Sequence, residues 1–270
     1  MRLRSYSGMR ALVTGASSGI GRGLALRLAS LGARVALVAR RADELEKLAG
    51  EIRAAGGEAA VLACDVEDAA SAADTCARAL ALWGGIDLLV NNAGYGHHRT
   101  FLEWEIEDME RMMRVNYFGT LYFTKAILPQ MVEQRRGWIV FVASVAGKIA
   151  PPEESAYAAT KHAMVGLAAS LSLEVEDAGV HVLTVCPGVI RTPFFDEEAL
   201  SRMAPAAKNG MVDVDGLVDA MIDALARGKH EITFPRGISP AYVIQAFAPE
   251  FMRRAVRRNT IDARAKSRGR

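Results

Sequence analysis

Seven short apolar runs alternate with longer helical patterns along most of this 270-residue chain, and this alternation constrains the fold more than any other feature. Strands that are apolar throughout are typical of a parallel sheet whose two faces are both covered by helices. We therefore expect a doubly wound α/β fold with a mostly parallel, seven-stranded sheet. The expected helices lie near residues 20–31, 42–55, 68–83, 106–134, 156–177 and 213–227, and the expected strands are Arg10–Thr14, Arg34–Ala39, Ala59–Ala63, Ile86–Val90, Trp138–Val142, Val180–Val185 and Glu231–Phe234.

The composition is that of a folded domain. Hydrophobic residues make up 51% of the chain and charged residues 24%, and no linker or internal repeat divides it. We predict one domain over residues 1–270, in which residues 236–270 form a C-terminal extension. The net charge of +2 argues against a dedicated nucleic-acid surface.

The start of the chain and its cysteines bear on the compartment. The first eight residues lack the apolar run of a signal peptide, and no apolar stretch reaches the roughly 18 residues that span a bilayer. Cys64, Cys76 and Cys186 are scattered and odd in number, without metal-ligand spacing, which is typical of free thiols in a reducing compartment. We expect a cytoplasmic protein without a metal site.

A glycine-rich turn directly follows the first predicted strand. Residues 14–21 read TGASSGIG and lead into an amphipathic helix. Glycines in such a turn let the backbone approach a pyrophosphate, which the amides at the helix N-terminus then bind. A tight turn without a ligand is the alternative, but the position between the first strand and the first helix favours dinucleotide binding. The predicted contacts are Gly15, Ser17, Ser18, Gly19, Ile20 and Gly21.

The residue after the second strand bears on which dinucleotide is bound. An acidic residue there would hydrogen-bond the ribose hydroxyls of NAD, whereas this chain has Arg40, and an arginine can pair with the 2′-phosphate of NADP. The alternative is that Arg40 and Arg41 are solvated residues at the start of a helix. We predict NADP.

The next two strands end in further candidates for cofactor binding. After the third strand, Asp65, followed by Val66, either accepts a hydrogen bond from the adenine amino group or caps the next helix. After the fourth strand, Asn92, Ala93 and Gly94 either let a ring pack closely against the backbone or form a simple turn.

Tyr157 and Lys161 are four residues apart in a segment with a helical pattern, so we expect them on one helix face. A nearby ammonium favours the phenolate and lowers the pKa of a tyrosine from about 10, which brings proton exchange closer to neutral pH. Alone this spacing is weak evidence, since any surface tyrosine and lysine on a helix can match it. Ser144 follows the fifth strand and is therefore expected at the same edge of the sheet.

Together these motifs resemble the short-chain dehydrogenase/reductase family over residues 9–235, and the resemblance implies its Rossmann-type fold. The match is specific because the motifs occur in order at compatible spacing: TGxxxGxG at 14–21, NNAG at 91–94, Asn116, Ser144, YxxxK at 157–161, and Pro187-Gly188.

The resemblance also implies roles for individual residues. Tyr157 would be the general acid or base, Ser144 would hold the carbonyl oxygen, and Lys161 would lower the pKa of Tyr157 and bind the nicotinamide ribose. Asn116 would position a water that connects Lys161 to solvent, although an asparagine in a helical pattern is otherwise an exposed or locally bonded side chain. The positions that hold the nicotinamide carboxamide, with the turn before them, are matched by Pro187, Gly188, Ile190 and Thr192.

The activity implied is that of an NADP(H)-dependent oxidoreductase that interconverts a carbonyl and an alcohol by hydride transfer, with NAD(H) less favoured. The alternative is a regulator of the same fold that binds NADP(H) without turnover. The family commonly assembles through its helices, so we expect a homodimer or homotetramer.

The substrate is indicated only by the residues around the expected site. The segment Phe194–Val212 is either a lid or a surface loop with its own small core, and His97 and His98 either touch substrate or have no role. Because Phe, Met and Ile outnumber charges there, we predict a largely apolar carbonyl or alcohol.

The C-terminal segment combines apolar and basic residues. Val243, Phe247 and Phe251 recur at four-residue spacing, Pro249 breaks any single long helix, and four arginines follow at 253, 254, 257 and 258. We expect terminal helices that pack their aromatics on the body with solvated arginines outside. The alternative is weak peripheral membrane contact through this segment.

Overall fold

The protein is described by a computed structural model that covers residues 1–203 and 205–262. One residue of the expected lid, Ala204, and the last part of the expected extension, residues 263–270, lie outside the described residues. Seven strands form one sheet in the order β3-β2-β1-β4-β5-β6-β7, and every neighbouring pair is parallel. The strands are β1 (Arg10–Thr14), β2 (Arg34–Ala39), β3 (Glu58–Ala63), β4 (Leu88–Asn91), β5 (Gly137–Val142), β6 (Val180–Pro187) and β7 (Glu231–Phe234).

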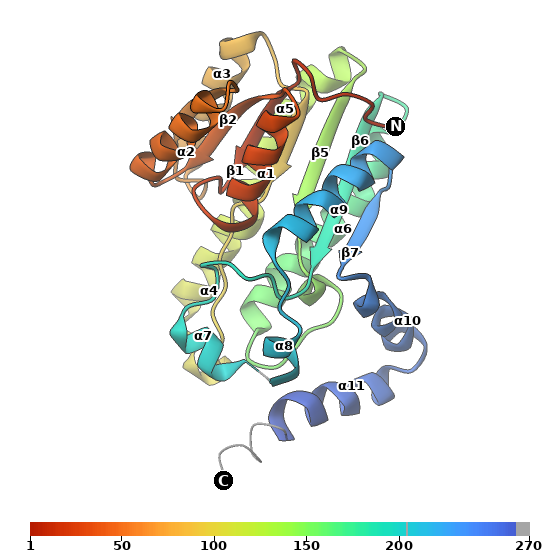
Figure 1. Ribbon diagram of the computed structural model, residues 1–270. Coiled ribbons are helices and arrows are strands. Elements are labelled where there is room, and N and C mark those ends of the chain that lie inside the picture. The colour runs from red at the N-terminus through yellow and green to blue at the C-terminus, as the bar shows by residue number, and fades with distance from the viewer. Residues whose placement is uncertain (204, 263–270) are drawn as a thin grey trace.

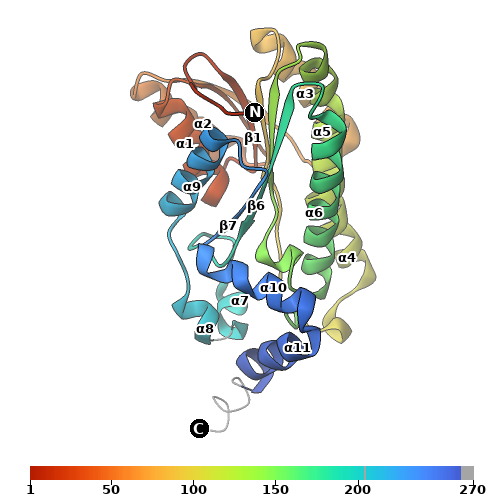
Figure 2. The same cartoon turned by 90° about the vertical axis from the view of Figure 1, so that its right-hand side faces the viewer.

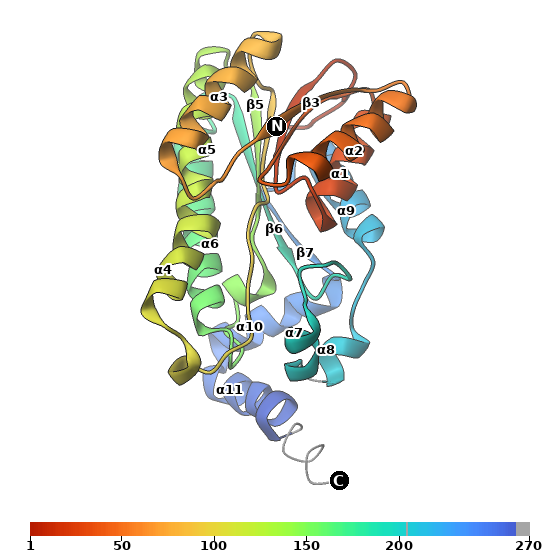
Figure 3. The same cartoon turned by 90° about the vertical axis from the view of Figure 1, so that its left-hand side faces the viewer.

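Helices cover both faces of this sheet, as the sequence predicts. One face carries α1 (Gly19–Ser30), α2 (Ala42–Ala54) and α9 (Val214–Arg227), and the other carries α3 (Ala69–Trp83), α5 (Gly119–Glu133) and α6 (Ser155–Val175) (Figure 2, Figure 3). The order of the strands reverses between β1 and β4, where a doubly wound sheet opens a crevice at its carboxyl edge.

The uniformly apolar strands supply two separate cores. Along β1, Ala11 and Val13 pack toward α1, while Leu12 packs toward the opposite layer. Along β5, Val140 and Phe141 divide between the two cores in the same way. Because successive side chains point to opposite faces, a strand buried on both faces must be apolar at every position.

The expected helix over 106–134 is interrupted. It consists of α4 (Ile106–Met113), a π-helical turn Arg114–Phe118 and α5. A π turn inserts an extra residue into the helix and is common at functional sites. Asn116 lies within this turn.

The residues after β6 form additional short elements at the carboxyl edge of the sheet. These are α7 (Glu197–Arg202) and α8 (Pro205–Asn209), and after β7 come α10 (Ser239–Phe247) and α11 (Pro249–Arg257) (Figure 1). As expected, Pro249 separates the two terminal helices. The expectation that their aromatics pack on the body is wrong: Phe247 is 87% exposed and Phe251 is 64% exposed.

In the described residues, no helix is long and apolar enough to cross a membrane.

Candidate active site

The turn after β1 has the backbone geometry that its glycines permit. Gly15 and Gly19 adopt positive φ angles of 67° and 55°, which side chains beyond glycine rarely adopt. A Cβ on Gly21 would collide with the carbonyl oxygen of Gly15 and the side-chain amide of Asn92. The turn therefore folds tightly onto the start of α1, with its backbone toward the crevice.

Hydrogen bonds fasten this turn to the end of β4. The hydroxyl of Thr14 donates to Val90 O at 3.1 Å and accepts from the backbone amides of Asn92 and Ala93, both at 3.0 Å. The Asn92 side chain donates to Thr14 O at 2.9 Å. The two strands that flank the switch point are thus held at a fixed separation.

A cavity of about 870 Å³ opens at this edge of the sheet. Two predicted site residues, Gly21 and Asn116, do not line the cavity but contact residues that do. The structure brings together in the cavity wall the other predicted residues, which are Gly15, Ser17, Ser18, Gly19, Ile20, Arg40, Asp65, Val66, Asn92, Ala93, Gly94, Ser144, Tyr157, Lys161, Pro187, Gly188, Ile190 and Thr192.

Tyr157 lies in the first turns of α6, with its half-buried ring packed against Phe194 at 5.7 Å between ring centroids. Ser144 follows β5 and is the N-cap of a 3₁₀ turn, where its hydroxyl oxygen accepts from the Ala146 amide at 3.1 Å. The Ser144 hydroxyl lies beside the Tyr157 phenol and favours a lower pKa of that phenol. Two hydroxyl groups therefore converge on one point of the cavity.

Lys161 lies one turn after Tyr157 and is only 3% exposed. Its Nζ donates to the carbonyl oxygen of Val142 at 2.9 Å and lies 5.6 Å from the centroid of the Tyr157 ring. Burial lowers the pKa of Lys161 to about 8, because an ammonium loses hydration inside the protein. The lysine can therefore gain or lose a proton near neutral pH.

The expected effect of Lys161 on Tyr157 does not appear. Burial raises the pKa of Tyr157 above its usual value, the Ser144 hydroxyl opposes this shift, and the Glu154 carboxylate adds to it. The prediction of a lowered tyrosine pKa is wrong for the protein alone. Desolvation of the ring dominates, and the lysine amine is directed to a backbone carbonyl.

Asn116 is fully buried and locally bonded. Its Oδ1 accepts from the Tyr95 amide at 3.0 Å, and its Nδ2 donates to Tyr95 O at 2.9 Å and to Thr160 Oγ1 at 3.1 Å. These bonds join the loop after β4 to α6. A Cβ on Gly94 would lie 3.0 Å from Asn116 Oδ1 and 3.7 Å from Lys161 Nζ, so both side chains flank the same glycine.

The structure also places three residues that follow β2 and β3. Asp68, not Asp65, caps α3 by accepting from the Ser71 amide at 2.7 Å. Asp65 accordingly remains in the cavity wall. Both Arg40 and Arg41 are exposed and line the cavity, and Arg41 donates to Ser17 Oγ at 2.9 Å.

The loop after β6 closes the opposite wall. Thr192 packs so closely that a Cβ on Gly19 would lie 3.2 Å from it. Ile190 is buried and bridges to Val212. A glycine turn with its backbone exposed to the cavity, an acidic residue after β3 and arginines after β2 fit a nicotinamide dinucleotide.

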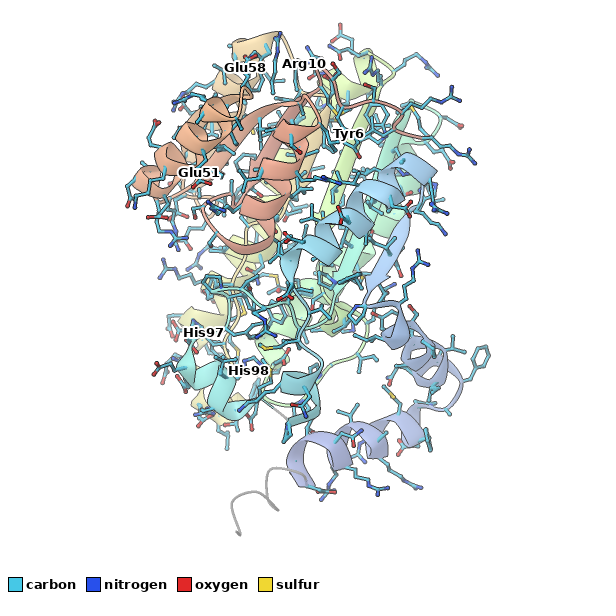
Figure 4. All side chains as sticks on the ribbon, viewed as in Figure 1. Tyr6, Arg10, Glu51, Glu58, His97 and His98 are labelled. Carbon is cyan, nitrogen blue, oxygen red and sulfur yellow. The ribbon has the colours of Figure 1, made fainter. Side chains whose placement is uncertain are left out.

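Several residues of the cavity wall escaped sequence reasoning. Trp104, Glu154, Met203 and Thr260 line it from four separate segments. Nε2 of His98 lies 3.0 Å from the Glu154 carboxylate, which ties the loop after β4 to the start of α6. Figure 4 labels His97 and His98 near the end of the molecule that carries α7. No motif marks such residues, because only the packing of distant loops brings them together.

Comparison with known families agrees with this geometry. The sequence model of the family described as short chain dehydrogenase matches residues 9–203. Oxidoreductase UcpA of Salmonella typhimurium is 42% identical over 199 residues, which are 73% of this chain and 74% of that protein. A dehydrogenase/reductase SDR family protein 7-like of Drosophila melanogaster is 40% identical over 67% of this chain and 57% of its own length.

Solved structures show the same architecture. A short-chain dehydrogenase/reductase from Burkholderia phymatum, in complex with NAD, superposes with a TM-score of 0.84 at 26% identity, covering 92% of this chain and 96% of that one. A metagenomic short-chain oxidoreductase in complex with NADP has a TM-score of 0.74 at 32% identity, covering 85% and 97%.

Proposed function

Because the chain belongs to the short-chain dehydrogenase/reductase family, we propose that it interconverts a carbonyl and an alcohol by hydride transfer, with NADP(H) as its cofactor. One observation carries this proposal. Ser144, Tyr157 and Lys161 lie together in a single cavity that also contains the glycine turn after β1. The nicotinamide cofactor would supply the hydride, and the protein would orient the substrate and exchange the proton.

The two hydroxyl groups would stabilise the charge that forms during reduction. Hydride addition makes the carbonyl oxygen negative, and the hydroxyls of Ser144 and Tyr157 are the hydrogen-bond donors at that point of the cavity. Because burial raises the pKa of Tyr157, its phenol is protonated at neutral pH and is in the form that can donate. In the direction of oxidation the phenolate would accept the proton instead.

Lys161 would return the proton to Tyr157. Its pKa of about 8 allows protonation and deprotonation near neutrality, and Asn116 flanks the same glycine. We expect a water near Asn116 Oδ1 to connect Lys161 with solvent. Asn116 otherwise acts as a positioning residue, since its side chain bonds two neighbouring segments.

The preference for NADP(H) rests on the residues after β2. Arg40 and Arg41 line the cavity where a 2′-phosphate would be bound, and Arg41 is already oriented by Ser17. Replacing Arg40 by aspartate should weaken NADPH binding far more than NADH binding, as measured by fluorescence titration. Equal loss of both affinities would remove the basis for this preference.

The substrate proposed is a largely apolar carbonyl or alcohol. Trp104, Phe194, Phe195 and Met203 contribute apolar surface to the part of the cavity near Tyr157. The tilted Phe194 ring covers the tyrosine, so an apolar substrate would exclude water from the point of proton transfer.

The decisive experiment is a screen of carbonyl compounds at fixed NADPH, followed spectroscopically, with the Tyr157→Phe variant as the matched control. Phenylalanine keeps the ring and its packing on Phe194, so turnover should fall at least a thousand-fold while NADPH affinity stays nearly unchanged. Turnover that persists in the variant would refute the assignment of the proton donor. Tight NADPH binding without turnover of any compound would favour the alternative, a regulator that binds NADP(H) without catalysis.

We further expect a homodimer or homotetramer that works in the cytoplasm. The buried state of Cys64, Cys76 and Cys186 supports a compartment that keeps thiols reduced. Light scattering after size-exclusion chromatography would measure the assembly.

A further inference from the structure

The two terminal helices carry large apolar side chains that are mostly exposed. Val243 is 59% exposed, and Phe247 and Phe251 are more exposed still. Figures 1 and 2 show α10 and α11 projecting from the body beyond the carboxyl edge of the sheet. Exposed aromatics grouped on a projecting segment mark an interaction surface.

This segment is also strongly basic. It holds nine of the 33 lysines and arginines but only two of the 31 acidic residues, so residues 236–270 have a net charge of +7 and the rest of the chain −5. On and just after α11, the exposed arginines at 253, 254, 257 and 258 face solvent, and among the described residues only Arg257 has an acidic partner, Asp262 at 3.8 Å.

A second apolar group lies at the same end of the molecule. Phe101, Leu102 and Ile106, in the 3₁₀ turn Phe101–Glu103 and at the start of α4, are all more than half exposed. In all three ribbon views this turn and α11 lie at the same end of the molecule (Figures 1, 2 and 3). Acidic residues at 105 and 107 flank this second group, so attraction to anions would come from the C-terminal segment.

We propose that this end of the protein docks on an anionic membrane surface, with Phe247 and Phe251 inserted among the headgroups and the arginines of α11 bound to acidic lipids. Helices that combine exposed aromatics with arginines bind at such interfaces without spanning the bilayer. The exposed arginines favour an anionic lipid surface over a second copy of the chain, because a dimer interface would bring these like charges close together.

The docking has a consequence for the active site, and this part rests on the proposed function. Thr260, three residues after α11, lines the cavity that contains Tyr157. A membrane-bound α11 therefore holds the cavity beside the lipid surface. Apolar substrates dissolved in the bilayer would reach the site without crossing water.

Vesicle sedimentation tests the docking with the full-length protein, without substrate or cofactor. Wild type should bind vesicles of phosphatidylcholine containing phosphatidylglycerol and not vesicles of phosphatidylcholine alone, and salt should release it. Because each basic residue near an anionic surface contributes roughly five-fold, the variant with Arg253, Arg254, Arg257 and Arg258 all replaced by glutamine should bind roughly several hundred-fold more weakly. The double variant Phe247→Ser/Phe251→Ser should lose at least ten-fold.

The matched controls are Leu82→Ser and Arg78→Gln on α3, at the opposite end of the molecule, which should bind as wild type does (Figure 1). Failure of wild type to bind anionic vesicles, or equal binding by all variants, overturns the proposal. Light scattering provides a further check: dissociation of an oligomer by the double phenylalanine variant would assign this surface to a second copy. Since no turnover is measured, failure here leaves the proposed reaction standing, and failure of the reaction leaves the docking standing.

Discussion

Replacing Lys161 by methionine should remove a pH dependence of stability that the buried amine creates. The pKa of Lys161 falls from 10.5 to about 8 on folding because the ammonium is buried. Below pH 8 the lysine is protonated in both states, and the folded state bears the full cost of burying the charge. That cost is about 3.5 kcal/mol, because each tenfold loss of proton affinity is worth about 1.4 kcal/mol.

The cost disappears as the pH rises. Between about pH 8 and 10.5 the folded protein releases the proton while the unfolded chain keeps it, so the wild-type free energy of unfolding gains about 1.4 kcal/mol per pH unit from this group. Methionine has no proton to release. The variant also leaves the Val142 carbonyl without its partner, which subtracts about 1–3 kcal/mol from its stability at every pH.

Urea unfolding of both proteins at pH 7, 8, 9 and 9.5 measures this effect. The stability of the variant relative to wild type should be highest at pH 7 and should decline by about 1.4 kcal/mol per unit above pH 8. The exposed Lys125, replaced by methionine in the same way, should show no such decline. If the difference in free energy of unfolding between Lys161→Met and wild type stays constant from pH 7 to 9.5, the assignment of a buried, weakly basic amine is refuted.

Three further outcomes follow from the geometry. Gly21→Ala should weaken NADPH binding more than ten-fold in a fluorescence titration, because the added methyl group collides with the turn. The control Gly50→Ala, on the open side of α2, should stabilise the protein by about 1 kcal/mol or less. Equal NADPH affinities of the Gly21→Ala variant and wild type would contradict the close approach. Asn116→Ala should cost about 3 kcal/mol in urea unfolding through its buried hydrogen bonds, and a loss below about 0.5 kcal/mol would contradict them. Phe194→Ala should hydrate Tyr157 and lower the pKa of its phenol, so the rate of alcohol oxidation should begin to rise at a lower pH. A rise at a higher pH would show that burial does not set the pKa of Tyr157.

Strand positions and the main motifs could be predicted because they depend on local patterns. β1, β2 and β7 begin and end at the predicted residues. For β1 and β2 the reason is that a strand buried on both faces is mainly apolar and stops at the first turn. The glycine turn was predictable for the same reason: positive φ angles and close approach restrict those positions to glycine.

Features that depend on distant contacts could not be predicted. The helical pattern over 106–134 gives no sign of the π turn at Arg114–Phe118, which accompanies the bonds of Asn116 to Tyr95 and Thr160. Likewise, the recurrence of apolar residues at Phe247 and Phe251 is the same whether their side chains are packed or exposed.

The sequence by itself determined the parallel sheet, the position of the crevice and the residue types that line it, because periodicity and strand ends are local properties of the chain. The tertiary structure alone decided the protonation behaviour. Tyr157 and Lys161 keep their helical spacing in any environment, yet the burial of both groups raises the pKa of one and lowers that of the other. Desolvation depends on which loops cover a side chain, and that covering is absent from any local pattern.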